Sequence, residues 1–223
     1  MAGHVFYVTP ACAESLERAL AQPAPGAHAK VVGLAVQASR CSVTRGIAPA
    51  GRLAVIDYSL PSTEPRLWVF DLDSRTLLFR ELVAHGRNSG DNFTKRFSNA
   101  DESRSSSVGM YRTMSPHTGH NGYSLRMQGL EPGFNDHAIE REIVIHGAPY
   151  VSADMAKAHG RIGRIGRTWG CPVVRPAVAH RLIDAMKEGQ LMFSYYPDAR
   201  WLNPSTYLNC SGVSKRKAAQ TRR

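Results

Sequence analysis

The sequence predicts a mainly β protein of the α+β class, with short helices packed on the sheet and a helical segment at its N-terminus. Between Leu53 and Tyr196, short runs rich in β-branched and aromatic residues alternate with turn residues, as strands do. Two helical patterns precede Leu53, and a third begins at Pro176. With 43% hydrophobic and 21% charged residues among 223, the chain can fill one ordinary core.

The N-terminal region has the pattern of two short helices. A cap followed by proline at Thr9–Pro10 begins the first, which we expect to end near Ala21. Residues 22–27, QPAPGA, are typical of a linker, and Lys30–Arg40 carries one apolar face. We therefore expect three regions along the chain: a helical appendage and linker over 1–50, a catalytic domain over 51–212, and a basic, disordered tail over 213–223.

Strands dominate the middle of the chain. LWVFDL and LLFRELVAH are separated by the turn residues Asp73–Ser74, which predicts a hairpin. The polar stretch His85–Asp101 is a long loop, and such loops in compact domains are usually functional or mobile. Further elements are expected in this order: strands over Ser107–Thr113 and Tyr123–Leu130, a helix from Pro176 closed by Gly189, and a last strand over Gln190–Tyr196.

Two residues in the stretch 143–175 have the setting of catalytic groups. His146 follows the apolar run IVI and precedes Gly147, so we expect it at the mouth of a buried strand. Cys171 stands between Gly170 and Pro172, which predicts a tight turn that presents the thiol. A thiol with a free pKa near ~8.5 needs a base or a positive charge to react at neutral pH. His146 is the expected base, with His85 as the alternative.

The bare pattern also permits a plainer interpretation, because a buried cysteine is commonly inert and a histidine at a strand end is commonly structural. The segment RIGRIGR just ahead of the cysteine shifts the balance. Its arginines, Arg161, Arg164 and Arg167, could lower the pKa of the thiol or bind substrate carboxylates. In the second case their alanine variants would raise KM more than they lower kcat. The alternative is a solvated basic loop.

The motifs HGAPYVS, RIGRIGR and WGCPVV, together with LVAHGRNSG and GYSLRMQG upstream, resemble the L,D-transpeptidase catalytic (YkuD-like) domain, in its murein L,D-transpeptidase branch. The resemblance covers roughly Leu53 to Tyr196. It implies a β-sandwich of mixed sheets, Cys171 as nucleophile, His146 as base, and the carbonyl of Gly147 as the group that orients the imidazole. The N–H groups of Gly170 and Cys171 would then face the oxyanion.

The sequence departs from the usual family motif, in which a Ser-His-Gly-Cys run is followed two residues later by an arginine. Here the run is Thr-Trp-Gly-Cys, with Val173 at the arginine's place. Turn chemistry explains residues 87–89 equally well, and Tyr123 fits a half-buried strand aromatic. Beside the three loop arginines, the substrate-binding residues that we expect are Arg87, Asn88, Ser89, Tyr123, Ser124, Tyr150, Thr168, Trp169 and Arg175.

By resemblance, the chain is a carbapenem-sensitive acyltransferase that acts on peptidoglycan stem peptides. Cys171 would attack the bond after the stem diamino acid, release D-alanine and form a thioester, which an amine of another stem resolves in a 3-3 or 1-3 crosslink. Two alternatives remain open: an L,D-carboxypeptidase that uses water, and a non-catalytic module that binds peptidoglycan or another anionic polymer.

The charge pattern does not choose a partner. Lys and Arg number 28 against 18 Asp and Glu, a net charge of +10, and five of the basic residues lie after residue 213. No motif for nucleic-acid binding is present, so we expect none, and we expect a monomer. His117 and His120 lack companion ligands at metal-binding spacing, so we expect neither a metal nor a cofactor.

The compartment is an expectation from resemblance alone. No stretch approaches the ~18 apolar residues of a membrane helix, and the N-terminus lacks a signal-like pattern. We expect a periplasmic or cell-envelope protein whose export signal has been removed, with a cytoplasmic protein as the alternative. The cysteines do not decide, because an active-site thiol leaves an odd set of three: Cys12, Cys41 and Cys210.

Overall fold

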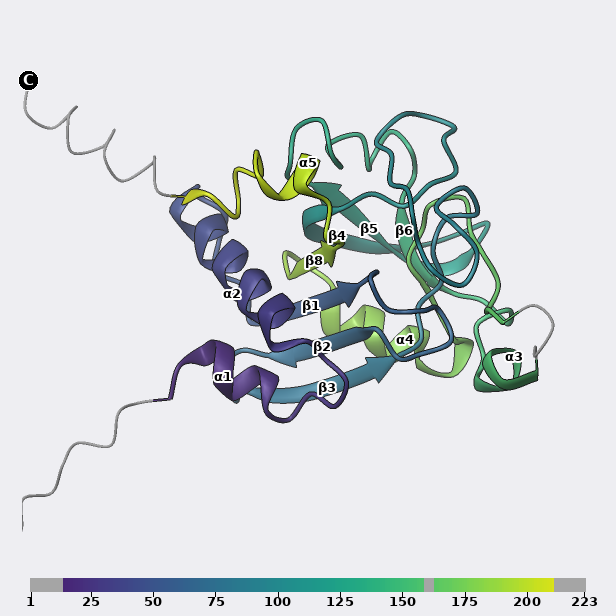
Figure 1. Cartoon of the computed structure of the whole chain (residues 1–223), viewed down its shortest axis with the longest axis horizontal. Coiled ribbons are helices and arrows are strands. Elements are labelled where there is room, and N and C mark those ends of the chain that lie inside the picture. Colours follow the sequence, from purple (N-terminus) through teal and green to yellow (C-terminus); the bar gives the residue numbers. More distant parts are fainter. Residues whose placement is uncertain (1–13, 159–162, 211–223) are drawn as a thin grey trace, which may run out of the picture.

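The computed structural model describes residues 14–158 and 163–210 (Figure 1). Eight strands form one mixed sheet in the order β3-β2-β1-β8-β4-β5-β6-β7. The expected mainly β fold with mixed strands and short helices is confirmed. The predicted helix start at Thr9–Pro10 and the basic tail lie outside the described residues. The strands are β1 (Arg52–Asp57), β2 (Leu67–Asp71), β3 (Thr76–Glu81), β4 (Gly109–Gly119), β5 (Gly122–Gly129), β6 (Val144–Gly147), β7 (Val173–Val174) and β8 (Leu191–Tyr195).

The centre of the sheet pairs strands that are distant in the sequence. β1 pairs in parallel with β8, with Leu53 opposite Leu191, and β8 pairs antiparallel with β4. All five residues of β8 are buried, as expected for a strand covered on both faces. β4 and β5 form a long hairpin, and β6 and β7 complete the edge at which the candidate site lies.

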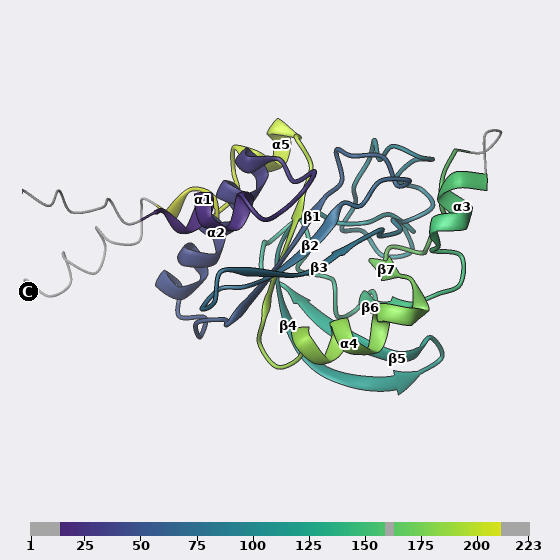
Figure 2. The ribbon, with the colours of Figure 1, turned by 90° about the horizontal axis from the view of Figure 1, so that it is seen from below.

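Helices cover the two faces of these strands, as Figure 2 shows. On one face, α1 (Leu16–Ala21), α2 (Ala29–Thr44) and α5 (Ala199–Leu202) pack against side chains of β1, β2 and β8, including Trp68, Phe70 and Phe193. The second predicted helix is thus present and slightly longer than expected. Because α2 shares this core with the sheet, it is not loosely attached, and the division of the chain near residue 50 stays a prediction.

α4 (Pro176–Met186) packs on the other face of the sheet, against β1, β5 and β6. It begins with proline at its first turn, as predicted, because proline lacks the N–H that the first turn leaves unbonded. Val178, Leu182, Ile183 and Met186 recur at helical spacing and are all buried. This helix supports the strand that carries His146. The short helix α3 (Ala153–Ala158) lies in the connection between β6 and β7.

A disulfide joins Cys41 in α2 to Cys210, across a sequence separation of 169 residues. Cys171 is the free cysteine among the described residues. Cys12 lies outside them. A crosslink that closes so long a loop restricts the unfolded chain and thereby stabilises the folded one.

We expect the Cys41→Ser, Cys210→Ser double variant to lose about 3 kcal/mol of unfolding free energy, because the unfolded ensemble regains the closed-loop entropy. Urea titration of both proteins with and without reductant measures this. The reduced wild type should match the double variant, and Cys171→Ser should not respond to reductant differently from the wild type. Equal urea midpoints for oxidised and reduced wild type would contradict the expectation.

Candidate active site

Parallel pairing of β6 with β7 brings the predicted histidine and cysteine together. His146 lies opposite Val173, and Cys171 stands two residues before Val173, beside Val144. The N–H of Val144 donates to the Sγ of Cys171 at 3.5 Å. Alternate residues of a strand share a face, so His146 and Val144 point to the side on which the sulfur lies. One pair of strands thus brings near each other two residues that are 25 positions apart in the sequence.

The imidazole of His146 is held in one orientation. Its Nδ1 lies 3.2 Å from the carbonyl oxygen of Gly147, so Nδ1–H donates there and Nε2 keeps its lone pair. Gly147 also needs to be glycine, because a Cβ there would lie 2.7 Å from the Cβ of Ala179 in α4. Burial lowers the pKa of His146, and the Gly147 hydrogen bond only partly opposes this. The ring is therefore neutral near pH 7, which suits a general base.

The thiol of Cys171 also has defined neighbours. Its Sγ–H points to the carbonyl oxygen of Glu142 at 3.8 Å, and the residue packs at the edge of two apolar clusters of buried residues. Burial raises the pKa of Cys171, while the Val144 N–H and the charge of Arg141 lower it less strongly. The resting site thus consists of a neutral thiol beside a neutral imidazole.

Thr168 locks the turn that presents the nucleophile. Its Oγ1 accepts from the N–H of Gly170 and donates to the carbonyl of Cys171, each at 2.9 Å. Gly170 has φ +135°, and a Cβ there would lie 2.9 Å from the carbonyl oxygen of Ser105. Of the two expected oxyanion donors, the N–H of Gly170 is already bonded, and within the described residues the N–H of Cys171 donates to no other residue. Thr168 is placed as a brace of the turn rather than as a substrate contact.

Arg141 is a site residue that the sequence reasoning missed. Its guanidinium donates at 2.7–3.1 Å to Ser98 O, Ser103 Oγ, Ser105 O and Ser107 Oγ. It is a positive charge that lowers the pKa of Cys171, one of the two roles that the sequence suggested for the arginines of RIGRIGR. The serine-rich run 103–107, which supplies three of its acceptors, is the signal that could have indicated a buried cation.

The loop arginines have internal partners. Arg167 donates to the carbonyls of Arg87 and Gly90 at 3.0 and 3.2 Å and to Asp91 at 3.1 Å, and Arg164 lies 3.7 Å from Asp91. Arg161 lies outside the described residues. Arg175, also expected to bind substrate, forms a two-pronged ion pair with Glu81 at 2.8 and 2.9 Å. The guanidinium groups of Arg164, Arg167 and Arg175 thus have partners within the protein, and their binding of substrate carboxylates stays a prediction.

We therefore expect Arg167→Ala to lower the unfolding free energy by about 1 to 2 kcal/mol, because three hydrogen bonds between the two loops are lost. The KM for a tetrapeptide donor should stay within about two-fold of the wild-type value, since the side chain faces its own loop partners. Thermal unfolding and steady-state kinetics measure the two effects. Arg96→Ala, a change at an exposed arginine outside the expected substrate contacts, is the matched control. A large rise in KM at unchanged stability would restore the substrate-binding role.

Residues 87–89 build the wall behind the nucleophile turn. Arg87 N–H donates to Thr168 O at 2.7 Å, Asn88 Nδ2 donates to Ser103 O at 2.9 Å, and buried Ser89 accepts from the N–H of Ser106 at 2.9 Å. Asn88 and Ser89 use their side chains for loop structure, as the turn-chemistry alternative expects. Arg87 and Asn88 are exposed, whereas Ser89 is buried.

Three other residues were expected to contact substrate: Tyr123, Ser124 and Tyr150. Tyr123 donates its OH to Asp184 at 2.9 Å and stacks on His180 in α4, so its hydroxyl is turned away from His146. Ser124 lies opposite His146 on the neighbouring strand and shares its face. The Tyr150 ring packs over Gly166, and burial together with the charge of Cys171 raises its pKa, which places it near the sulfur. 

Trp169, next to the nucleophile turn, is 69% exposed. The guanidinium carbon of Arg104 lies 4.8 Å from the centre of its ring. Trp169 therefore stands at the rim of the site, where a substrate could contact the rest of its surface. 

His85 is not placed to serve as the base. Its Nδ1 accepts from Arg66 at 2.6 Å, and its Nε2 lies 3.3 Å from the carbonyl of Gly90. Burial and the neighbouring Arg66 charge lower the pKa of His85 to about 3. Arg66 is itself fully buried and also donates to the carbonyls of Val83 and Leu60. This pair is structural.

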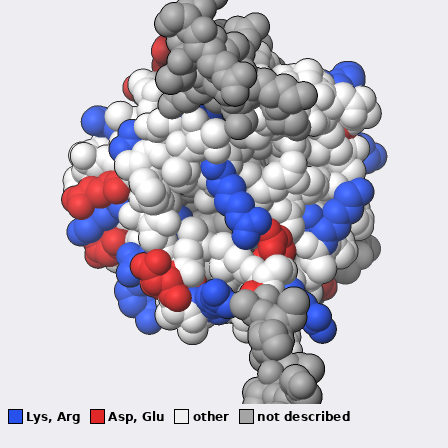
Figure 3. Space-filling view, turned by 90° about the vertical axis from the view of Figure 1, so that its left-hand side faces the viewer, with Lys and Arg blue, Asp and Glu red and all other residues white. Residues whose placement is uncertain are grey.

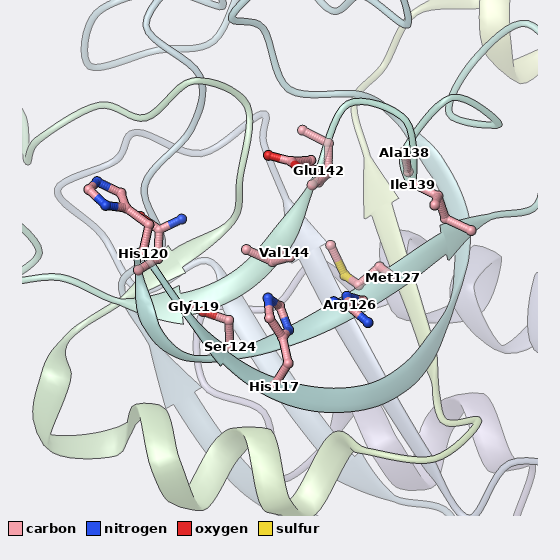
Figure 4. Close-up of a pocket in the computed structure, with 12 residues that line it drawn as sticks. His117, Gly119, His120, Ser124, Arg126, Met127, Ala138, Ile139, Glu142 and Val144 are labelled. Atoms are coloured by element: carbon pink, nitrogen blue, oxygen red, sulfur yellow. The ribbon is translucent and has the colours of Figure 1, made fainter.

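A cavity of about 370 Å³ lies between the β4–β5 hairpin and residues 138–144 (Figure 4). Glu142 and Val144, the two residues whose backbone contacts Sγ, line it. The β4–β5 hairpin contributes His117 and Arg126 to its lining. Neither Cys171 nor His146 is among the residues that line it.

Three further features concern metal ligands, membrane-spanning helices and surface charge. Within residues 14–158 and 163–210, no three His, Cys, Asp or Glu side chains gather as metal ligands, and none of the helices has the length and apolar character of a membrane span. On the face shown in Figure 3, Lys and Arg are interspersed with Asp and Glu, and no continuous basic patch is present there.

Several solved structures are similar to this chain. An L,D-transpeptidase from Mycobacterium smegmatis is 12% identical, with 66% of this chain and 59% of that chain covered and a TM-score of 0.41. L,D-transpeptidase 1 from Mycobacterium tuberculosis is 13% identical, with coverages of 66% and 62% and a TM-score of 0.35. An L,D-transpeptidase fragment from Xylanimonas cellulosilytica is 14% identical, with coverages of 81% and 91% and a TM-score of 0.35. The chain therefore spans less than two thirds of the length of the first two.

A comparison with curated proteins gives no match. The family model for the L,D-transpeptidase catalytic domain matches residues 24–195, which is more than half of the chain and includes both His146 and Cys171. The chain belongs to the L,D-transpeptidase catalytic domain family.

Proposed function

We propose that this protein is a cysteine-dependent L,D-transpeptidase, in which Cys171 forms a thioester with a peptidoglycan stem peptide. One observation carries the proposal. The β6–β7 pairing puts Cys171 two residues before Val173, the residue opposite His146, and the Nδ1 of His146 is bonded to the Gly147 carbonyl, which supports Nε2 as the acceptor of the thiol proton.

In the first step, the thiol proton passes to His146 as Sγ attacks the carbonyl carbon of the stem diamino acid. The negative charge that develops on the carbonyl oxygen is stabilised by the N–H of Cys171, which donates to no other residue among those described. When the tetrahedral intermediate collapses, the C–N bond breaks and His146 gives its proton to the departing D-alanine nitrogen. The thioester remains on Cys171.

Arg141 assists the attack of the sulfur through its fixed positive charge. It is fixed by four hydrogen bonds beside the turn, so its charge favours the thiolate without requiring any movement. A guanidinium that approaches from the segment before β6 would replace the arginine that the common family motif places two residues after the cysteine.

The acceptor defines the product. An amine of a second stem gives a 3-3 or 1-3 crosslink, whereas water gives carboxypeptidase activity. We place the reaction in the periplasm or cell envelope, with the protein acting as a monomer. The family's action on the cell wall supports this location, as does the Cys41–Cys210 disulfide, because such bonds persist in oxidising compartments.

Intact-protein mass spectrometry after mixing with a carbapenem tests the thioester. The strained lactam acylates an activated thiol, so we expect one covalent adduct per chain, located on Cys171 by peptide mapping. Incubation with a tetrapeptide stem should also release D-alanine. The Cys171→Ala protein is the control for both assays. A folded wild-type protein that forms no adduct and releases no D-alanine would instead favour a non-catalytic module that binds peptidoglycan.

A further inference from the structure

The nucleophile turn contains three successive peptide groups, and Thr168 holds only the outer two. Its Oγ1 accepts from the N–H of Gly170 and donates to the carbonyl of Cys171. The middle peptide group, which joins the carbonyl of Gly170 to the N–H of Cys171, has a different partner. The Oγ–H of Ser106 donates to the carbonyl oxygen of Gly170 at 3.2 Å. This middle group carries the oxyanion donor of the proposed mechanism.

The middle peptide group needs a partner because a glycine precedes it. Glycine has no Cβ, so steric contacts alone do not decide which way the following peptide group faces. A planar trans peptide directs its C=O and N–H to opposite sides, so a donor that holds the carbonyl of Gly170 also sets the direction of the N–H of Cys171. Burial raises the pKa of the Cys171 thiol, and its own N–H is among the groups that oppose this rise, so that N–H lies on the side of the sulfur.

Ser106 is itself fixed, with a residue exposure of 1%. Its N–H donates to Ser89 Oγ at 2.9 Å, and its carbonyl accepts from the N–H of Ser98 at 3.1 Å. Its Oγ accepts from the N–H of Gly86 at 3.0 Å. Because that N–H points at a lone pair of Oγ, the hydroxyl proton is left to point at the carbonyl of Gly170. The hydroxyl is therefore a directed donor.

The segment that carries Ser106 meets the nucleophile turn at a second place. Gly86 forms a parallel bridge with Thr168, whose N–H donates to the carbonyl of His85 at 2.9 Å. Gly86 also lies so close to the serine-rich run that a Cβ there would be 2.6 Å from the carbonyl oxygen of Arg104. One glycine thus connects the turn to the segment before β4. Main-chain contacts therefore set the position of the Ser106 hydroxyl relative to the turn.

We infer that Ser106 is a positioning residue for thioester formation: its hydroxyl holds the carbonyl of Gly170 so that the N–H of Cys171 faces the oxygen on which negative charge develops. The same hydrogen bond polarises the peptide group, which makes its N–H a stronger donor. Ser106 acts through the turn and not on the substrate itself. This inference rests on the proposed thioester and adds to it the group that orients the oxyanion donor.

Two reagents that modify the same sulfur test the inference: a carbapenem and iodoacetamide. Attack on the carbapenem places negative charge on the lactam oxygen. With iodoacetamide the sulfur displaces iodide from a saturated carbon, so no oxyanion forms. Ser106→Ala should slow acylation of Cys171 by the carbapenem about 10-fold, because the middle peptide group loses its donor. Alkylation should stay within about two-fold of the wild-type rate, since the thiol and its base are unchanged.

Quenched mass spectrometry of the peptide that contains Cys171 measures both rates, and D-alanine release by Ser106→Ala should fall in kcat rather than rise in KM. Ser106→Cys fills the same space with a weaker donor, and its loss should be smaller. Ser194→Ala is the matched control. Ser194 is also buried and donates from Oγ to a carbonyl, that of Ser107 at 2.9 Å, but it does not contact the turn. Both of its rates should match the wild type.

The contrary outcomes are distinct. Equal slowing of acylation and alkylation in Ser106→Ala would overturn the inference, because the hydroxyl would then act on the thiol or on the fold. Unchanged acylation in a folded Ser106→Ala protein, or a selective loss in Ser194→Ala, would overturn it too. If Ser106→Ala does not fold, a wild-type ratio of the two rates in Ser106→Cys overturns it. These results leave the proposed function standing. A wild-type protein that is alkylated on Cys171 but forms no carbapenem adduct and releases no D-alanine would overturn both.

Discussion

Cys171→Ala is expected to lower the rate of D-alanine release from a tetrapeptide by about 10⁵-fold to 10⁶-fold, to the level of a site that only binds. Within the described residues, no second free cysteine is present to replace the nucleophile. Alanine keeps the backbone turn, because Thr168 holds it through main-chain groups of Gly170 and Cys171. The same variant should form no carbapenem adduct.

The folded state of this variant should be nearly unchanged. The thiol contributes one long contact to Val144 N–H and one to Glu142 O, both weak for sulfur. We expect its thermal midpoint within about 3 °C of the wild type, as for a loss of less than 1 kcal/mol. A folded Cys171→Ala protein with wild-type turnover would remove the proposed mechanism.

His146→Ala is expected to slow acylation of Cys171 by about 10²-fold to 10⁴-fold at neutral pH, which is the usual contribution of a positioned base. Donor binding should change much less, so the loss should appear in the acylation rate constant rather than in its half-saturation concentration. Stopped-flow or quenched mass spectrometry with a carbapenem measures both quantities. His137→Ala, a change at an exposed histidine, is the control.

The pH profile provides a second test. In the wild type, acylation requires a neutral His146. Since burial lowers its pKa below the ordinary value of 6.5, the rate should rise with pH at a midpoint below that value and then level off. Burial raises the pKa of Cys171 above 9.0, so a second rise follows only in alkaline solution. His146→Ala should keep the alkaline rise alone. An unchanged profile in His146→Ala would assign the base to another group.

Local patterns were sufficient to predict much of this molecule. The apolar run before His146, the glycine–cysteine–proline turn and the Pro176 helix are properties of a few adjacent residues, so periodicity and turn chemistry indicated them correctly. The pairing of residues distant in sequence was beyond those rules. Arg175 meets Glu81 across 94 positions, and Arg141 meets serines 34 to 43 positions away.

The same limit applies to the arginines near the nucleophile. An arginine near a nucleophile reads as a substrate contact when only its neighbours are known. Whether the guanidinium is free depends on which carboxylate or carbonyl the fold places within ~3 Å of it. Asp91 and Glu81 occupy Arg167 and Arg175, whereas Arg126 has no such partner among the described residues.

The position of β8 at the centre of the sheet determines when the protein can fold during its synthesis. β1 and β4 do not pair with each other, and both require residues 191–195 between them. Until this last strand has left the ribosome, β1 has an unsatisfied edge and the two halves of the sheet remain separate. Contacts between residues this distant form slowly, so the two halves of the sheet are expected to join only after residues 191–195 have been synthesised. Before that, the chain can still be threaded through a narrow translocation channel.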